Sequence, residues 1–559
     1  MGFAHEYAAA IMQRGRVHME PVSFVPDWSD RPRKGKFYPG AESFPLPEGD
    51  CPATATVRAG VLPDRAERDE PFTLPLLGGM LLDSYGRVGR RLGVQANTDL
   101  PSLPCYTDAN FSRGTASGGG LYPVTVYWVS GAAGPLTPGV YHYSTTHHAM
   151  QRLLAGDVSA EVRDALADPE LPEECDQFLV LGVKFWQNAF KYNSFSMHAV
   201  SMDVGAALQT WRIWARARGL RVEPALWFDE ERLGRLLGVS IEEEGLFAVV
   251  PLRWEGTRPG AARPGTRPGA ARPGTRPGAA RPGTRPGAAR PAAVPGDAPS
   301  VRRQDSERSR RVLTFETVRR IQAATAENAT VRPAPGALLP ATVAAAPDGE
   351  RLALPDPRPP EMGVRQALRE RRSSFGRFDA RRPVEGEDLA ATLAACAAAS
   401  LDSDAGDGAG GARLTRLYVF VNHVRGIAPG AYAYDAATGE LVLVKPGPPG
   451  GFLQRNYFLS NYNLEQTGAV VVPAVRTTAV LDAVGDRGYR LVNATIGAVA
   501  QTFYTTATAL GLGSGVALGF DNLSFVEELG LAATGEAPLL VMLIGHERPG
   551  TADFRYEIA

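Results

Sequence analysis

Hydrophobic positions form two long, related stretches in this chain of 559 residues. From Tyr489 to Phe520 the pattern predicts a long apolar helix that ends at Gly511 and leads through a glycine-rich turn into a short strand. A weaker copy of this pattern runs from Ser201 to Phe228. Matching residues of the two stretches are 292 positions apart; they are Gly205 and Gly497, Gln209 and Gln501, Gly219 and Gly511, and Phe228 and Phe520.

A turn-and-strand motif repeats at nearly the same distance. PGVYHY at 138–143 matches PGAYAY at 429–434, an offset of 291. A constant offset over five landmarks indicates two copies of one fold on a single chain. Both copies mix helices with short apolar strands, which predicts an α+β fold in which helices cover a sheet.

Short apolar runs predict the strands, and longer periodic runs predict the helices. Strands are expected at 124–130, 138–143, 178–183 and 245–252 in the first copy, and at 417–422, 429–434, 469–473 and 539–545 in the second. Further helices are expected over 74–92, from about 197, over 312–325 and from 363.

Composition divides the chain into five parts. Residues 1–70 are irregular and rich in proline and charge, which predicts an arm that packs on a surface and does not fold alone. Residues 71–255 and 361–559 are the two domains. Four perfect copies of GTRPGAARP fill 256–291 and cannot form a core, so 256–311 is interpreted as a linker. Residues 312–360 are interpreted as a short helix and a connector.

Charge and cysteine content narrow the function classes. Lys plus Arg number 59 and Asp plus Glu number 60, so no overall field favours nucleic acid or a membrane surface as a partner. The eight arginines of the repeats could contact acidic partners or RNA, or serve only as a soluble spacer. Four cysteines and the histidines at 142, 147 and 148 show no metal-ligand spacing, so no metal site is expected. No leader or membrane span is predicted, which favours a cytoplasmic protein.

Two stretches of the second copy have the composition of a ligand site. RERRSSFGRF at 369–378 joins a predicted helix end to a loop, and its guanidinium and hydroxyl groups suit a phosphate; a solvated basic helix end is the alternative. GLGSGVALGF at 511–520 follows a helix and enters a strand, so it does not fit a dinucleotide fingerprint. Its glycines could let backbone amides approach a planar ligand, whereas a helix C-cap explains Gly511 alone.

The first copy supplies what the second lacks. SRGTASGGGLYP at 112–123 places three glycines after Ser117, which frees backbone N–H groups for an anion or a flat ring, whereas the second copy has only DGAGGARLTRLY at 407–418. Conversely, the first copy has Val222, Pro224 and Ala225 where the second has its glycine turn. One composite site, shared between the copies, is the economical interpretation.

An adjacent lysine and tyrosine, Lys191 and Tyr192, precede the long helix of the first copy and have no counterpart in the second. A nearby ammonium favours the phenolate, so the pair could supply a base. Both groups titrate near ~10 in model peptides, and a base near neutrality needs a shift of roughly 3 units, which only a desolvated pocket supplies. A solvent-exposed dipeptide is the alternative.

The motif set resembles a known family. DWSDRPRKGKFYPGAESFPLP at 27–47, SGGGLYP, PGVYHY and the Lys-Tyr pair resemble the SagB/McbC-type azoline dehydrogenases, FMN enzymes of the nitroreductase superfamily that mature ribosomally made peptides. RRSSFGRF and ALGLGSGVALGF resemble a nitroreductase domain more directly. The tandem arrangement is similar to dehydrogenases of thiopeptide-like pathways. The resemblance implies two nitroreductase-like domains, each with a mixed or antiparallel central sheet, joined as an intramolecular pseudo-dimer.

The resemblance also implies roles for individual residues. Lys191 and Tyr192 match the family's catalytic pair, with Tyr192 expected as the base and Lys191 tuning it. The FMN site would take residues from both copies: Arg371, Arg372, Ser373 and Arg377 for the phosphate and ribityl chain, Gly513, Ser514, Leu518 and Gly519 from the glycine turn, and Ser117, Gly118 and Gly119 from the first copy. Phe375 stands where the family has a second arginine, and Arg87, Arg90 and Arg91 are poor substitutes for a phosphate site in the first copy.

The implied reaction is oxidation of thiazoline or oxazoline rings in a precursor peptide to thiazoles or oxazoles, with dioxygen as terminal oxidant. The implied partners are that peptide and a YcaO-type cyclodehydratase, and further oligomerisation is left open. Two rival hypotheses remain: a nitro- or quinone-reducing flavoprotein supplied by NAD(P)H, and a flavin-free scaffold that holds a precursor peptide for a cyclising partner.

Overall fold

The computed structural model describes residues 2–62, 69–92, 109–256, 298–401, 403–405, 413–549 and 555–557. The elements of the first half are α1 (Phe3–Gln13), β1 (Glu42–Pro45), α2 (Val57–Val61), α3 (Leu74–Tyr85), β4 (Val124–Ser130), β5 (Gly139–Ser144), β6 (Ala149–Ala155), α4 (Ser159–Leu166), β7 (Gln177–Lys184), α5 (Trp186–Tyr192), α6 (Ser196–Arg216), α7 (Glu230–Leu237) and β8 (Glu244–Pro251).

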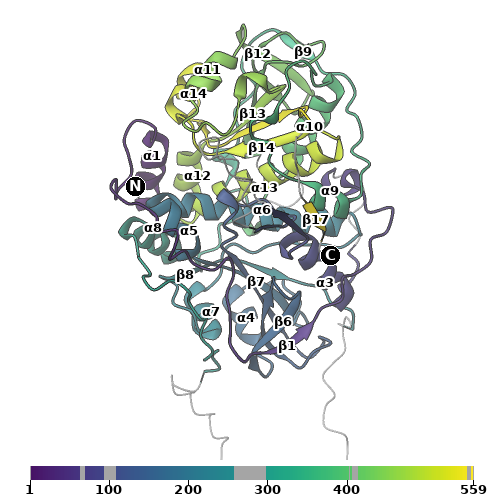
Figure 1. Ribbon diagram of the computed structural model, residues 1–559. Coiled ribbons are helices and arrows are strands. Elements are labelled where there is room, and N and C mark those ends of the chain that lie inside the picture. Colours follow the sequence, from purple (N-terminus) through teal and green to yellow (C-terminus); the bar gives the residue numbers. More distant parts are fainter. Residues whose placement is uncertain are drawn as a thin grey trace, which may run out of the picture.

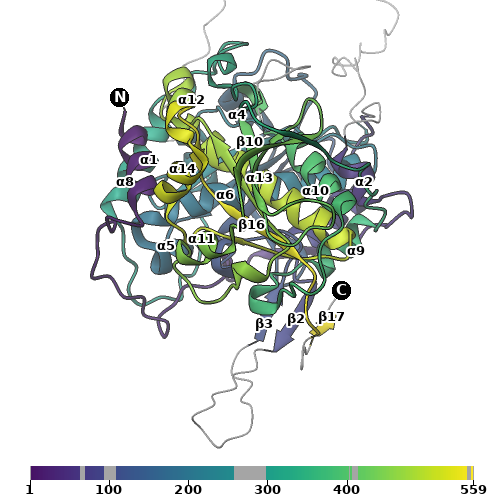
Figure 2. The same ribbon diagram turned by 90° about the horizontal axis from the view of Figure 1, so that it is seen from above.

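The connector and the second half continue this order. Their elements are α8 (Glu316–Glu327), β9 (Arg351–Ala353), α9 (Val364–Glu370), α10 (Gly386–Ala398), β10 (Thr415–Val421), β11 (Gly430–Asp435), β12 (Glu440–Pro446), α11 (Gly450–Arg455), β13 (Ala469–Val475), α12 (Thr477–Val484), α13 (Gly488–Ala509), β14 (Gly513–Ala517), α14 (Asn522–Leu529), β15 (Ala537–Pro538) and β16 (Val541–Gly545). A small third sheet joins β2 (Gly89–Leu92) and β3 (Ala109–Ser112) to β17 (Arg555–Glu557), and it lies near the C-terminus (Figure 2).

Two antiparallel sheets lie on opposite sides of the long helices α6 and α13 (Figure 1). The first sheet has the strand order β1-β6-β5-β4-β7-β8, and the second has the order β14-β16-β13-β10-β11-β12-β9. Successive residues of a strand face opposite sides: Leu179 and Leu181 of β7 point to the central core, and Phe178 and Val180 to an outer cluster that includes α4 and α7. Helices therefore cover both faces of each sheet, which confirms the predicted α+β class.

The strand registers repeat from one half to the other. Tyr127 of β4 lies opposite Val180 of β7, and their counterparts Tyr418 and Val472 lie opposite each other in the second sheet. The β5–β6 pair has a register shift between Val140 and Tyr141, and the β11–β12 pair has one between Ala431 and Tyr432, 291 positions later. The duplication expected from the sequence is thus present in the hydrogen-bond pattern itself.

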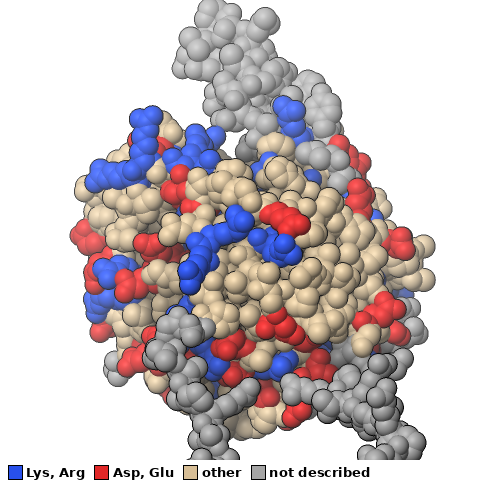
Figure 3. All heavy atoms as spheres, turned by 90° about the horizontal axis from the view of Figure 1, so that it is seen from below, with Lys and Arg blue, Asp and Glu red and all other residues tan. Residues whose placement is uncertain are grey.

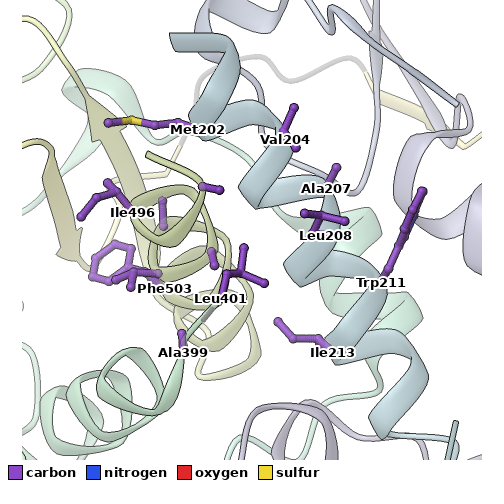
Figure 4. Packing of buried hydrophobic residues seen from close by; sticks show 14 of the residues in the cluster. Met202, Val204, Ala207, Leu208, Trp211, Ile213, Ala399, Leu401, Ile496 and Phe503 are labelled. Carbon is purple, nitrogen blue, oxygen red and sulfur yellow. The ribbon is translucent and has the colours of Figure 1, made fainter. Parts of the chain in front are cut away.

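Helices α6 and α13 cross closely enough to require glycine on both sides (Figure 4). A Cβ on Gly205 would lie 1.9 Å from the carbonyl oxygen of Ala494, and a Cβ on Gly497 would lie 2.0 Å from that of Met202. These two contacts exchange under the offset of 292, as the contacts of a twofold dimer do. The chain therefore forms a pseudo-dimer within itself.

Three regions differ from the sequence-based expectations. The arm is not wholly irregular, because α1 buries Ala4, Tyr7 and Ile11, at helical spacing, and packs on α8, α12 and α14. The helix predicted over 74–92 ends at Tyr85, and 89–92 is a strand instead, since it pairs with 555–557. The helix predicted over 312–325 begins four residues later, at Glu316.

Some expectations concern residues that the structure does not describe. The repeats lie outside the described residues except for Gly256, so their role as a linker stays a prediction. Residues 407–412 of DGAGGARLTRLY and Cys105 also lie outside the described residues. Within the described part of the chain, no helix is long and apolar enough to cross a membrane.

Candidate functional site

The glycine loop of the first half is fixed by one buried carboxylate. Asp203 of α6 accepts hydrogen bonds from the Ser117 hydroxyl (2.6 Å) and from the Gly118 N–H (2.8 Å). Ser117 in turn accepts a hydrogen bond from the N–H of Tyr122. Gly119 and Gly120 follow with φ values of 61° and 63°, a left-handed conformation that favours glycine. The predicted loop is therefore a rigid turn anchored on the central helix.

Lys191 and Tyr192, at the end of α5, lie directly against this loop. A Cβ on Gly119 would approach the Tyr192 hydroxyl to 2.5 Å and the Lys191 ammonium to 2.7 Å. The Lys191 nitrogen lies 4.8 Å from the centre of the Tyr192 ring. The structure thus brings together two motifs that are about seventy residues apart in the sequence, and glycine at 119 provides the space for both side chains.

Burial sets the protonation of this group. It raises the pKa of Tyr192 to about 12, with the charge of Asp203 acting in the same direction. It lowers the pKa of Lys191. It raises the pKa of Asp203 to about 7, against the hydrogen bonds from Ser117 and Gly118. The pKa of Tyr192 is therefore shifted in the direction opposite to the one that favours a phenolate, because burial and the Asp203 charge both raise it.

In the second half the arginine–serine loop runs beside β14. Helix α9 ends at Glu370, as the sequence predicted, and the N–H of Ser374 donates to the carbonyl of Ser514 (2.8 Å). The Ser373 and Tyr504 hydroxyls are 2.8 Å apart, and the Tyr504 oxygen also accepts from the N–H of Val516. The loop and the glycine turn, predicted as separate elements of one site, therefore share Tyr504 of α13 as a common partner.

Two arginines of this loop share one carboxylate. Arg372 lies 2.7 Å and Arg377 3.6 Å from the same carboxylate, Glu547. The Ser374 and Ser514 hydroxyls, Nε of Arg377 and Oε1 of Glu547 are buried without a hydrogen-bond partner among the described residues. The two hydroxyls and the guanidinium N–H are donors that a phosphate ester would satisfy, and the carboxylate oxygen is an acceptor for a polyhydroxyl chain. The residues present therefore fit FMN.

Arg371 joins the two halves at this point. Its guanidinium donates to the carbonyls of Gly114 (2.9 Å) and Arg113 (3.1 Å), three residues before Ser117, and packs on the Tyr504 ring. Gln501 of α13 also holds this loop, since its side chain accepts from the N–H of Ala116 (2.9 Å). The arginine loop of one half and the glycine loop of the other are thus bound to each other, as a composite site requires.

The glycine turn makes close contacts with protein. A Cβ on Gly513 would lie 2.5 Å from Glu547 and 2.7 Å from the Ser374 hydroxyl, so glycine here admits the arginine–serine loop. The carbonyl of Leu518 accepts a hydrogen bond from Arg14, and that of Gly519 accepts one from the N–H of Phe458. Contact of these residues with a planar ligand stays a prediction.

The N-terminal segment also contacts residues of the candidate site in both halves. Arg14, just after α1, places its guanidinium 4.9 Å from the Phe195 ring and 5.9 Å from the Phe520 ring. Phe195 packs edge-on against Tyr192. A continuous chain of contacts therefore runs from Lys191 and Tyr192 to the glycine turn of the second half.

Asp203, Arg14 and Tyr504 are site residues that the sequence analysis did not predict. Asp203 was detectable in principle, because position 495, which is 292 residues later, is threonine. A buried carboxylate that only one copy contains indicates a function that only that copy performs. Among the described residues, no three His, Cys, Asp or Glu side chains group as metal ligands.

Comparison with known proteins agrees with this geometry. Residues 368–546 match the family model described as the nitroreductase family. This match lies within the second half of the chain. A protein of Methanocaldococcus jannaschii named as a nitroreductase is 33% identical over 141 residues, which cover 23% of this chain and 64% of that protein. The chain therefore spans less than two thirds of that relative's length.

Solved structures extend the comparison to both halves. The crystal structure of an Anabaena variabilis protein titled as a nitroreductase covers 98% of this chain and all of its own, with a TM-score of 0.68 and 19% identity. At this identity the match shows a shared fold, which is nitroreductase-like over the whole tandem. Part of the E. coli microcin synthetase McbBCD complex with truncated pro-MccB17 bound matches 32% of this chain and 70% of that chain, at 17% identity and a TM-score of 0.28.

Proposed function

We propose that this protein is an FMN-dependent dehydrogenase that oxidises thiazoline or oxazoline rings in a precursor peptide to thiazoles or oxazoles. The observation that carries the proposal is the placement of Lys191 and Tyr192 against Gly119, in a loop tied to the arginine–serine motif of the nitroreductase domain. A reductase needs a flavin and an open face, whereas removal of a carbon-bound proton needs a positioned base as well.

The residues divide into cofactor-binding and catalytic groups. Arg371, Arg372, Ser373 and Arg377 would hold the phosphate and ribityl chain, with Gly513, Ser514, Leu518 and Gly519 on the same side. Ser117, Gly118 and Gly119 would close the site from the first half. FMN, when bound, supplies the acceptor for the hydride that leaves the ring, and dioxygen would be the terminal oxidant.

The directions of the pKa shifts support Lys191 as the proton acceptor. Burial lowers the pKa of Lys191 and raises the pKa of Tyr192. The neutral amine of Lys191 therefore forms more readily than the phenolate of Tyr192. Lys191 would accept the proton from the former α-carbon of the ring, and Tyr192, kept protonated, would donate a hydrogen bond that orients the substrate. This reverses the roles expected from the sequence and keeps the same two residues.

A second candidate function is reduction of nitro or quinone compounds with NAD(P)H. The match of residues 368–546 to the nitroreductase family favours it. The two functions differ in the source of electrons: NADPH should reduce the flavin of a reductase rapidly, whereas a dehydrogenase receives its electrons from the peptide. A cyclodehydratase that makes the azoline ring is the partner expected of the dehydrogenase.

The test uses the full chain, a count of released FMN, and a synthetic thiazoline peptide whose loss of two hydrogen atoms is followed by mass spectrometry. Lys191→Met and Tyr192→Phe should keep FMN and lose roughly 10²–10⁴-fold in rate, the range of general acid–base catalysis. Lys445→Met and Tyr432→Phe, on the second half away from the site, are the matched controls. Fast NADPH oxidation without peptide oxidation would establish the reductase instead, and a protein that takes up no FMN would refute both.

A further inference from the structure

A cavity of about 740 Å³ lies beside the candidate site, between the N-terminal arm and the strands β4 and β5. It shares Gly119 with the site, and Phe190, the residue before Lys191, forms part of its wall. The described residues that line it include no Asp or Glu and seven cations, namely Arg31, Arg33, Lys34, Lys36, Arg87, Arg113 and Arg308. A volume of this size is in the range of ligand pockets.

None of the described residues in the cavity wall is a counterion for this charge. Lys36 is neutralised by Glu244, which lies outside the lining. Arg113 is buried and rests on the Tyr122 ring, 4.4 Å from its centre. Burial lowers the pKa of Lys34, and repulsion from Arg113, Arg31, Lys191 and Arg87 lowers it further. Like charges held together under partial burial are unfavourable until an anion joins them.

The single sign of this lining is a local property. The chain as a whole has a formal net charge of −1. On the face shown in Figure 3, Lys and Arg side chains lie among Asp and Glu side chains. The clustering of cations in the cavity is therefore not a consequence of a basic surface.

The cover of the cavity is held in place before any ligand arrives. The N–H of Phe37 donates to Asp305 (2.7 Å), and the N–H groups of Arg310 and Arg311 donate to Asp30. Trp28 packs edge-on against Phe190, 5.2 Å between ring centres. The arm and the segment after the repeats are thus bound to each other over the first half, so the cavity is a preformed site.

We propose that this cavity binds acidic side chains of the peptide substrate next to the ring that is oxidised. The inference rests on the proposed function, because it places the ligand beside Lys191. The wall contains the aromatic rings of Trp28, Phe37, Phe111 and Phe190 as well as the cations, which suits a segment carrying both carboxylates and apolar side chains. A lone phosphate group would need fewer cations and no aromatic wall.

The test measures binding of fluorescent heptapeptides to the full chain by anisotropy. A peptide of alternating glutamate and leucine should bind at least roughly tenfold more tightly than its glutamine counterpart, and the difference should shrink at high salt, since salt screens charge. Lys34→Gln and Arg87→Gln should each remove most of the difference. Lys445→Gln and Arg235→Gln, outside the cavity, should leave it unchanged.

Three results would overturn the proposal. They are equal affinity for the two peptides, unchanged preference in Lys34→Gln and Arg87→Gln, and displacement of the acidic peptide by micromolar pyrophosphate or NADPH, which would make the cavity a phosphate site. The peptides contain no azoline ring, so binding is read independently of oxidation. FMN content and thermal unfolding of each variant show whether it is folded. Binding without ring oxidation would therefore refute the proposed function and not the presence of an acidic-peptide site.

Discussion

The crossing of α6 and α13 gives the most direct test of the pseudo-dimer. In Gly205→Ala the new Cβ would meet the backbone oxygen of Ala494 at 1.9 Å, whereas real contacts of this kind essentially never fall under 3.0 Å. The helices must therefore separate by about 1.1 Å. Backbone atoms cannot rotate away as a side chain can, so we expect a cost at the upper end of overpacking, about 3 kcal/mol.

Helix propensity offsets part of that cost. Alanine is favoured over glycine by about 1 kcal/mol in a helix interior, which leaves a net destabilisation of about 2 kcal/mol. For a domain of this size that corresponds to a fall in Tm of roughly 4–8 °C. Gly497→Ala should behave alike, because its Cβ would meet Met202 at 2.0 Å. The double variant should lose less than the sum, since helices already separated by one methyl group accommodate the second.

The assay is thermal unfolding followed by circular dichroism, with released FMN counted on the same samples. Asp203 lies on α6, and Gln501 and Tyr504 lie on α13, so separation of the helices should also loosen the cofactor site. Gly451→Ala is the matched control: it is a helical glycine whose Cβ would meet only the flexible end of Arg455, at 3.3 Å. A Gly205→Ala protein that unfolds within about 1 °C of wild type would refute the close crossing.

Three further predictions concern charge. Burial raises the pKa of Asp203 to about 7, so the folded state keeps a proton that the unfolded state releases near its usual ~3.9; this contribution to stability is complete at pH 4 and is lost as the pH rises to 7. Asp203→Asn should remove this loss of stability. Plots of Tm against pH that stay parallel for the two proteins from pH 5 to 8 would contradict the prediction. Because burial lowers the pKa of Lys191, the rate of dehydrogenation should rise with pH and level off at a pH below the ordinary lysine pKa of ~10.4. If the residual activity of Lys191→Met shows the same rise with pH, another residue is the base. Arg487→Met should cost about 3 kcal/mol, the low end for a broken buried ion pair, because Glu230 would lose one guanidinium but keep Arg490, the Gln322 amide and the Leu246 N–H as partners. The exposed Arg235→Met serves as control in the same unfolding assay, and equal Tm values would contradict the expectation.

The strands and helices of the repeated framework could be predicted from the sequence, because the apolar pattern of an element and the residue that ends it are both local signals. Strands β4 and β13 begin at the predicted residues, and helix α13 ends within two residues of Gly511. The offset between the copies also carried over to three dimensions, where it fixes the strand registers. The chain contains two copies of one fold. Residues that match between the copies therefore indicate positions that the fold requires.

Contacts between distant segments could not be predicted. The strand at 89–92 reads as the end of a helix until 555–557 pairs with it. The Asp203–Ser117 hydrogen bond joins residues 86 positions apart, and the Arg371–Gly114 bond joins residues 257 apart. The direction of the Tyr192 pKa depends on the depth of burial, which a dipeptide does not reveal. The helix α1, in contrast, was readable from the spacing of Ala4, Tyr7 and Ile11 and was overlooked among the prolines that follow it.

The two halves explain why one site should survive where a symmetric dimer has two. At the offsets of 291 and 292 that relate the two sheets and the two long helices, only apolar residues, between Gly79 and Leu82, stand where Arg371, Arg372 and Ser373 do. Leu81 and Leu82 are buried, α3 continues as a helix through this stretch, and Asp83 binds Arg365 at 2.9 Å.

In a homodimer a change from arginine to an apolar residue would remove both phosphate sites at once. In a tandem chain such a change removes one and leaves the other, because each position occurs twice. Apolar residues of α3 are buried where the arginine–serine loop stands in the second half, and Asp203, Lys191 and Tyr192 have no counterpart there. Under the proposed function, the second half would hold the cofactor and the first half would transfer the proton.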